Sequence, residues 1–203
     1  EYLTRVNLMD AANPSTDTPI NLGKKVLVVG GGNTAMDSCR TAKRLGADVT
    51  LVYRRSEAEM PARIEEVKHA KEEGIKFLTL HNPKEYLTDE NGAVKAAVLD
   101  VMQLGEPDQS GRRRPETTGE TITIECDQVI VAVGVSPNPL VPKSIEGLTL
   151  GRKNTIAVND QMQSSRKEIY AGGDIVRGGA TVILAMGDGR RAAMNMSKQL
   201  TEA

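Results

Sequence analysis

A glycine-rich turn in residues 24–35 is the part of the sequence with the clearest chemistry. Gly30, Gly32 and Ala35 have the spacing G-x-G-x-x-A, the Ala-ending form of a dinucleotide-binding fingerprint. Gly30 lets the chain turn sharply, Gly32 lets the backbone approach a pyrophosphate, and Ala35 lets the next helix pack closely on the strand. The anion would lie against free N–H groups at the positive end of that helix. One glycine motif is weak evidence, but here a strand pattern precedes it and a helix pattern follows it.

Two arginines follow the second predicted strand, at residues 48–53. A protein that binds NAD usually has an Asp or Glu there, which holds the ribose 2′-hydroxyl. This sequence has Arg54 and Arg55 instead, and arginine can bind a phosphate with two hydrogen bonds. We therefore predict NADP(H) rather than NAD(H); the alternative is that both are solvated surface charges. An S-adenosylmethionine site also uses a glycine loop, but it too would be expected to have an acid here.

These residues must be positioned by the elements between them, and the sequence there predicts an amphipathic helix. Asn33 is a plausible N-cap, and Gly46 stands where a C-terminal glycine belongs. Ala35, Cys39 and Ala42 share one face, which we expect to pack against the sheet.

A second helix is expected to open at Pro61, since proline is favoured in the first turn. Ile64, Val67 and Ala70 would form its apolar stripe, and Gly74 would end it. The resulting order, strand–helix–strand–helix, is typical of a dinucleotide-binding domain.

The pattern then predicts a third strand, a β-meander and a returning strand. The expected elements are a strand at 76–80, a turn at 89–92, antiparallel strands at 96–104 and 121–126, a polar loop at 105–119, and a buried parallel strand at 127–133. The polar loop contains Arg112, Arg113 and Arg114. Charge runs on hairpin loops are usually solvated, so no function is assigned to these three arginines.

The end of the chain has a different pattern. Residues 135–139 interrupt the regular elements, a short strand is expected at 156–159, and a strand at 169–174 runs into a glycine turn that ends in Asp174. A long helix is predicted from about 181 to 200. Its expected core-facing stripe consists of Val182, Met186, Gly189, Ala193, Met196 and Leu200.

Composition excludes several classes of protein. Hydrophobic residues make up 39% and charged residues 26%, which is typical of a folded chain. The net charge of −1 and the 2% aromatic content argue against nucleic-acid partners and base stacking. No apolar run reaches transmembrane length and no signal peptide opens the chain, so we expect no membrane partner and a cytoplasmic protein.

The cysteines and histidines do not indicate a metal site. Cys39 and Cys126 form no C-x-x-C pair and are expected to be buried thiols in a reducing compartment. His69 and His81 lack metal-ligand spacing and are expected at the surface or in loops.

Six short motifs follow one another along the chain. They are G-G-G-N-T-A-M-D at 30–37, Y-R-R at 53–55, M-P-A-R at 60–63, V-G-V-S-P-N-P at 133–139, A-G-G-D at 171–174 and G-A-T-V-I-L-A-M-G at 179–187. Over nearly all its length the chain resembles the C-terminal portion of the small (beta) subunit of NADPH-dependent glutamate synthase, in the pyridine nucleotide-disulfide oxidoreductase superfamily. The same module recurs in ferredoxin–NADP transhydrogenase and dihydropyrimidine dehydrogenase.

The resemblance implies an α/β fold: a Rossmann-like three-layer NAD(P)-binding domain with a β-meander, plus a partial FAD-domain segment that ends in a long helix. The implied division is a linker or remnant of the FAD domain at 1–21, the NADPH domain at 22–135 and the incomplete FAD-domain segment at 136–203.

The resemblance also implies site residues. The NADPH pyrophosphate would lie against Gly30, Gly31, Gly32, Asn33, Thr34 and Ala35, and the 2′-phosphate against Arg54, Arg55 and Arg63. Asp174 would bind the FAD ribityl chain, and Ala180, Thr181 and Val182 would face the flavin pyrimidine edge. Gly134 and Gly173 complete the implied cofactor positions.

The implied reaction is hydride transfer between NADPH and FAD, in which the protein orients the rings and no side chain is obligatory as a catalyst. In the family, electrons pass through iron–sulfur clusters to a large subunit that makes glutamate, or to another electron-accepting subunit. The final acceptor stays open.

The chain departs from the full family pattern in one large way. It begins with Glu1, and it lacks both the FAD domain's own glycine fingerprint and the N-terminal cysteines that bind the clusters. We therefore expect a piece of a longer protein, inactive and poor at binding FAD by itself. It also lacks the C-x-x-C of thioredoxin reductases, so a disulfide reductase is disfavoured.

Three alternatives remain at this point. The chain could be a nucleotide-binding module without turnover, or the equivalent subunit of a ferredoxin–NADP transhydrogenase. It could also be a regulatory NADP(H) sensor, although such a sensor has no need of Asp174 or the glycine turn before Thr181.

Overall fold

Four parallel strands form a sheet in the first part of the computed structural model, which describes residues 1–109 and 111–202; Ser110 and Ala203 lie outside the described residues. The chain divides into two compact units, Glu1–Val133 and Gly134–Ala203. Each unit is described by itself.

The sheet of the first unit has the order β3-β2-β1-β7. Its strands are β1 (Lys25–Val29), β2 (Asp48–Tyr53), β3 (Lys76–Thr79) and β7 (Gln128–Val131). Val28 in β1 pairs with Leu51 on one side and with Ile130 on the other, so β1 is central. The predicted strand–helix–strand order is therefore confirmed, with the carboxyl ends of β1 and β2 next to each other at one edge of the sheet.

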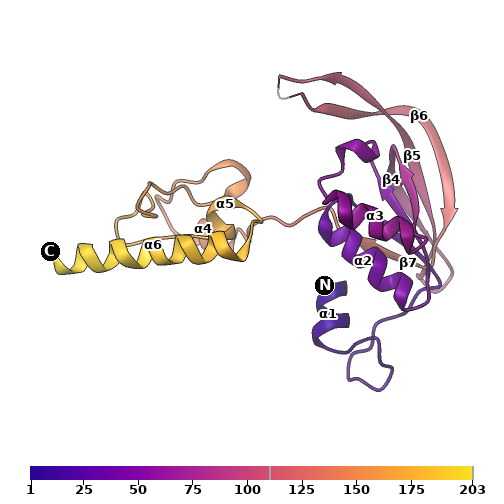
Figure 1. The fold of residues 1–203 in the computed structure, drawn as a ribbon, viewed down its shortest axis with the longest axis horizontal. Helices are drawn as coiled ribbons and strands as arrows, with labels where there is room; N and C mark the ends of the chain where they lie inside the picture. The colour runs from indigo at the N-terminus through magenta and orange to yellow at the C-terminus, as the bar shows by residue number, and fades with distance from the viewer. Residues whose placement is uncertain (110, 203) are drawn as a thin grey trace. The chain divides into compact units, whose positions relative to one another are not determined.

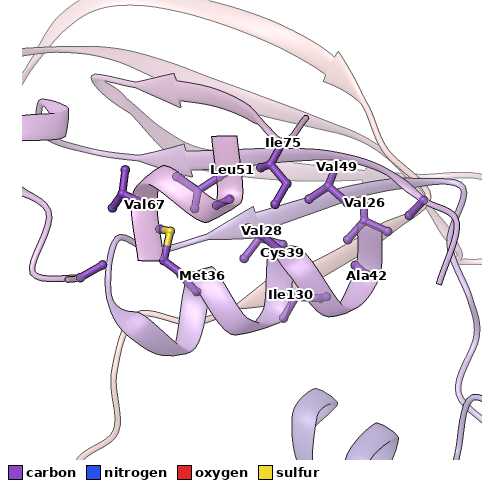
Figure 2. Close-up of a cluster of buried hydrophobic side chains, with 14 residues drawn as sticks. Val26, Val28, Met36, Cys39, Ala42, Val49, Leu51, Val67, Ile75 and Ile130 are labelled. Atoms are coloured by element: carbon purple, nitrogen blue, oxygen red, sulfur yellow. The ribbon is translucent and has the colours of Figure 1, made fainter. Parts of the chain in front are cut away.

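Helices cover one face of this sheet (Figure 1). They are α1 (Tyr2–Leu8), α2 (Asn33–Arg44) and α3 (Ile64–Glu72). Val26 and Val28 point toward them and pack with Met36, Cys39 and other buried side chains (Figure 2). Ala35, Cys39 and Ala42 are buried, as predicted for the packed face of α2.

A three-stranded antiparallel sheet covers the other face. It consists of β4 (His81–Thr88), β5 (Val94–Pro107) and β6 (Arg113–Glu125), in the order β4-β5-β6. Leu27 and Val29, which alternate with Val26 and Val28 along β1, pack with Ala97 and Leu99 of β5. Because successive side chains of a strand point to opposite faces, one apolar run serves both cores, and the expected three-layer α/β fold is confirmed.

The structure corrects several details in the antiparallel region. β4 was not predicted, because it is an edge strand with mostly polar residues, and it accommodates Pro83. His81 therefore begins a strand instead of lying in a loop. The strands β5 and β6 are longer than expected: β5 ends at Pro107 and β6 begins at Arg113, so Arg113 and Arg114 belong to β6.

Two helix starts also differ from expectation. α2 begins at Asn33 with Gly32 as its N-cap, so Asn33 is not the cap. α3 begins at Ile64, after the 3₁₀ turn η1 (Glu57–Glu59), and Pro61 precedes it by three residues. Ile64 is 83% exposed, whereas Val67 is buried. Helical side chains point back toward the N-terminus, so the side chain of Ile64, the first residue of the helix, extends beyond the helix start.

The returning strand is less buried than predicted. β7 covers Gln128–Val131, and Val131 is 62% exposed. The reason is the strand order, since β7 lies at the edge of the sheet and, among the described strands, pairs with β1 alone. The predicted turn at 89–92 is confirmed, with Asp89 accepting hydrogen bonds from the N–H groups of Asn91 and Ala93.

The second unit consists mainly of loops and one long helix. Its elements are α4 (Leu140–Ser144), the 3₁₀ turn η2 (Arg152–Asn154), α5 (Asp174–Arg177) and α6 (Val182–Thr201). The strands expected at 156–159 and 169–174 are replaced by isolated bridges, including Val158 with Ser164 and Gln163 with Tyr170. No helix in the described part of the chain is long and apolar enough to cross a membrane.

The inner face of α6 is offset from the predicted stripe. Asp188 and Ala192 are the buried residues, while Val182, Met186 and Leu200 are exposed. The buried positions precede Gly189 and Ala193 of the predicted stripe by one residue, a rotation of about 100° around the helix. A Cβ atom on Gly172 would lie 2.7 Å from the Asp188 Cβ, so the close approach of this backbone sets the inner face.

Candidate nucleotide-binding site

The three glycines after β1 have different surroundings. A Cβ on Gly30, whose φ is +142°, would lie 2.2 Å from the Ala132 carbonyl oxygen, and one on Gly31 would lie 2.6 Å from the Tyr53 ring. A Cβ on Gly32 would meet nothing nearer than Pro61, at 4.0 Å. The first two glycines therefore fit against the chain's own atoms, whereas the space over Gly32 is open to a ligand.

Free backbone donors surround that space. Gly32 caps α2 in an extended conformation, with no side-chain cap, and its carbonyl accepts the N–H groups of Ala35 and Met36. Within the described residues, the N–H groups of Gly32, Asn33 and Thr34 have no hydrogen-bond acceptor. Such a helix start fits an anionic phosphate, through both its unpaired donors and the helix dipole.

The segment before α3 is attached to this turn. The Asn33 Oδ1 atom accepts a hydrogen bond of 2.9 Å from the Arg63 N–H. The Ala62 N–H donates to the Gly31 carbonyl oxygen at 3.0 Å. Asn33 thus acts as a bridge instead of a cap, and it brings the backbone of Arg63 to the glycine turn.

Arg54 and Arg55 lie at the same edge of the sheet, immediately after β2. Val29 and Val52 are paired neighbours, so the glycine turn and the arginines leave adjacent strands. In the part of the chain that the structure describes, neither arginine forms a salt bridge, and the buried Nε of Arg55 has no hydrogen-bond partner. An unpaired buried donor and two unneutralised charges fit an anionic ligand such as the 2′-phosphate.

The predicted residues of the second unit gather around α5 and the start of α6. Asp174 is the first residue of α5, and its Oδ1 atom accepts a 3.2 Å hydrogen bond from the Ala180 N–H. Thr181 caps α6 by accepting from the Leu184 N–H at 3.4 Å, and Val182 is 75% exposed. Gly134 and Gly173 both have positive φ, +101° and +74°. Asp174 also lines a shallow hollow with Val135, Ser136, Pro137, Asn138, Ile175 and Gly179.

Sequence reasoning missed two residues that hold these sites together. The Asp188 carboxylate, 1% exposed, binds Arg177 and the Gly173 N–H beside Asp174. Glu59 binds both Ser56 and Arg113 next to the arginine pair. A lone acid in the small-residue run of α6 was a usable signal for Asp188; no local pattern pointed to Glu59.

A protein-family model described as pyridine nucleotide-disulphide oxidoreductase matches residues 3–189. Similar curated proteins include subunit beta of the NADPH-Fe(3+) oxidoreductase of Geobacter sulfurreducens, 40% identical over 91% of this chain and 31% of that protein. Subunit beta of the NADP(+)-dependent formate dehydrogenase of Moorella thermoacetica is 43% identical over 89% of this chain and 26% of that protein. The glutamate synthase [NADPH] small chain of Escherichia coli is 42% identical over 84% of this chain and 38% of that protein. The chain thus spans less than half of each of these relatives.

Solved structures with the same fold include the thioredoxin reductase of T. acidophilum, with a TM-score of 0.72 and 24% identity, over 88% of this chain and 53% of that one. FprA from Mycobacterium tuberculosis in complex with NADPH has a TM-score of 0.70 and 20% identity, over 91% of this chain and 54% of that one. At this level of identity the likeness concerns the fold alone.

Proposed function

The chain belongs to the pyridine nucleotide-disulphide oxidoreductase family, and from that premise we propose that it is the NADPH-binding part of a flavin-dependent oxidoreductase, most like the glutamate synthase small subunit. One observation carries the proposal: within the described residues, Arg54 and Arg55 form no salt bridge, and the N–H groups at the start of the helix that follows the glycine turn have no acceptor. When bound, the two cofactors supply hydride transfer between NADPH and FAD.

In this proposal the residues of the first unit bind and orient NADPH. The N–H groups of Gly32, Asn33 and Thr34 hold the pyrophosphate, and Gly30 and Ala35 let the strand, turn and helix approach closely. Arg54, Arg55 and Arg63 distinguish NADPH from NADH by binding the 2′-phosphate. All of these residues lie in the range 22–135, which we predict to be the NADPH domain.

The second unit would supply part of the FAD site, as predicted for the segment at 136–203. Asp174 would accept hydrogen bonds from the ribityl chain. The capped start of α6, at Thr181, would face the flavin pyrimidine edge, where its N–H groups and dipole stabilise negative charge. The rest of the FAD site and the iron–sulfur clusters would belong to a region outside these 203 residues.

An electron-accepting partner subunit is also part of the proposal. The relatives are described as a small chain and as beta subunits, which supports a multi-subunit assembly. The partner would correspond to a glutamate synthase large subunit or to another acceptor. Cys39 and Cys126 are both free thiols, which supports a reducing compartment such as the cytoplasm.

Calorimetric titration of the purified chain with NADPH, NADH and FAD in separate runs tests the proposal. We expect tight NADPH binding, weak NADH binding and no FAD binding. Equal affinity for NADPH and NADH would contradict the role of the arginines, and loss of both would contradict the glycine-turn site. An NADPH-oxidation assay with a dye acceptor, with and without FAD, then separates binding from turnover.

A further inference from the structure

The β5–β6 hairpin reaches the loop that carries Arg54 and Arg55. β4 pairs with β5 only as far as Val101, whereas β5 and β6 remain paired up to Pro107 and Arg113, so the hairpin continues as a two-stranded ribbon (Figure 1). At its end, the Arg113 Nε atom donates a 3.2 Å hydrogen bond to Glu59 Oε1. The expectation of a fully solvated arginine run is therefore wrong for Arg113.

Glu59 connects this hairpin to the arginine loop. Its Oε2 atom accepts hydrogen bonds from the N–H and the hydroxyl of Ser56, at 3.2 and 3.0 Å. Its backbone oxygen accepts from the Tyr53 hydroxyl at 2.9 Å. Burial alone would raise the pKa of Glu59, but the hydrogen bonds from Ser56 and the charge of Arg113 hold that pKa below its usual value. The charged form of Glu59 is thus the one that the site favours.

Arg112 directly precedes Arg113 in the chain, and two hydrogen bonds with Asp108 hold its backbone. The Asp108 N–H donates to the Arg112 carbonyl oxygen at 2.9 Å, and the Arg112 N–H donates to Asp108 Oδ1 at 3.1 Å. Burial raises the pKa of Tyr53 and the negative charge of Glu59 raises it further, whereas the positive charges of Arg55, Arg54 and Arg112 act against that rise. The three guanidinium groups therefore act on one phenol, although Arg112 is more than fifty residues away in sequence.

Within the described residues, the side chains of Arg54, Arg55 and Arg112 form no salt bridge. Glu59 pairs with Arg113 instead. Like charges that converge without a counter-ion repel one another, unless an anion binds between them. The cluster therefore fits a multiply charged anion better than it fits an empty surface.

We propose that Arg112 is a third cation for the 2′-phosphate of NADP(H), and that the contact between Glu59 and Arg113 positions it there. The inference rests on the proposed function, because it adds a residue from a separate segment to the same site. Arg112 is then a specificity-determining residue, and Glu59 and Arg113 are positioning residues.

The test compares two ligands that differ only in the 2′-phosphate, 2′,5′-ADP and 5′-AMP, together with NADPH and NADH. We expect Arg112→Ala to weaken binding of 2′,5′-ADP and NADPH by roughly 3- to 10-fold, with 5′-AMP and NADH nearly unchanged. Arg114→Ala is the matched control, since it removes the same charge from the neighbouring exposed position. It should leave all four affinities unchanged.

A second set of variants tests the positioning role. Arg113→Ala should lower the preference for NADPH over NADH, and Arg113→Lys, which retains a charge for Glu59, should restore part of it. Combining Arg113→Ala with Arg112→Ala should add little, because both act through one guanidinium. Additive losses, or equal losses for NADPH and NADH, would overturn the positioning role.

The outcomes also separate this inference from the proposed function. If Arg112→Ala behaves like Arg114→Ala, while loss of Arg54 and Arg55 still abolishes the NADPH preference, only the role of Arg112 is overturned. If the unmodified chain binds NADPH no better than NADH, the proposed function and this inference both fail.

Discussion

Asp188 of α6 accepts two hydrogen bonds of 2.6 Å from the guanidinium of Arg177, at the end of α5. The same carboxylate accepts a third, of 3.1 Å, from the Gly173 N–H. It therefore fixes both ends of the four-residue helix that begins with Asp174. The side-chain hydrogen bonds from Arg177, followed by the one from Gly173, lower the pKa of Asp188 to about 2.

This arrangement makes the stability of the second unit sensitive to acid. Because the folded pKa of Asp188 is about 2 and its ordinary value is 3.8, its contribution is present above about pH 4 and is lost as the pH falls through 2. Asp188→Asn should lower the thermal midpoint by several degrees at pH 7 and flatten the acid dependence in that range. Asp160→Asn, at an exposed position, is the control, and an equal effect of both substitutions would contradict the role of Asp188.

Replacing both Arg54 and Arg55 with Ala should weaken NADPH binding by about 10- to 100-fold, because each guanidinium contributes charge-assisted hydrogen bonds to a phosphate. NADH, which lacks the 2′-phosphate, should be affected much less. Calorimetric titration of the double variant with the two cofactors measures the difference. Equal weakening for both would show that the arginines do not read the 2′-phosphate.

Gly30→Ala and Gly32→Ala should have opposite consequences. A Cβ at residue 30 meets a carbonyl oxygen at 2.2 Å with φ at +142°, so we expect a loss of about 2–4 kcal/mol in the free energy of unfolding. A Cβ at residue 32 has space and φ of −94°, so stability should change by less than about 1 kcal/mol. The second variant should nevertheless bind NADPH poorly, because its methyl group occupies the ligand's space. Chemical denaturation and titration of both variants check the pair.

The two thiols should be unreactive in the folded chain. Burial raises the pKa of Cys39 to about 12, and burial also raises the pKa of Cys126. At pH 8 the thiolate, which is the reactive form, is therefore scarce and covered. We expect slow modification by a thiol reagent under native conditions and rapid modification of both residues in denaturant. Rapid labelling of Cys39 in the native chain would contradict its place in the core.

The orientation of α6 can be tested with two neighbouring alanines. Ala192 is buried and Ala193 is exposed. Ala192→Glu would bury an unpaired carboxylate and should destabilise the second unit by about 3 kcal/mol or more. Ala193→Glu should change stability by no more than about 0.5 kcal/mol. The reverse result, measured by thermal unfolding, would restore the stripe expected from the sequence.

Local patterns predicted the first unit well for a physical reason. Apolar alternation in β1, the spacing of Ala35, Cys39 and Ala42, and the glycines that end α2 and α3 each act over a few residues. The edge strand β4 has no such pattern, since it pairs with β5 on one side only and none of its residues is buried. In α6, small and apolar residues fall on more than one face, so the stripe predicted from periodicity differs from the buried one.

The sequence by itself therefore determined the glycine turn, the helix and strands around it, and the arginines that end β2, because these depend on backbone conformation and short-range periodicity. Only the tertiary structure decided which face of α6 is inside, since the close approach of Gly172 selects it. It also decided that Asn33 binds Arg63 instead of capping its own helix, and that Arg113 meets Glu59 across 54 residues. Contacts of this kind depend on how separate elements pack, and no local spacing encodes them.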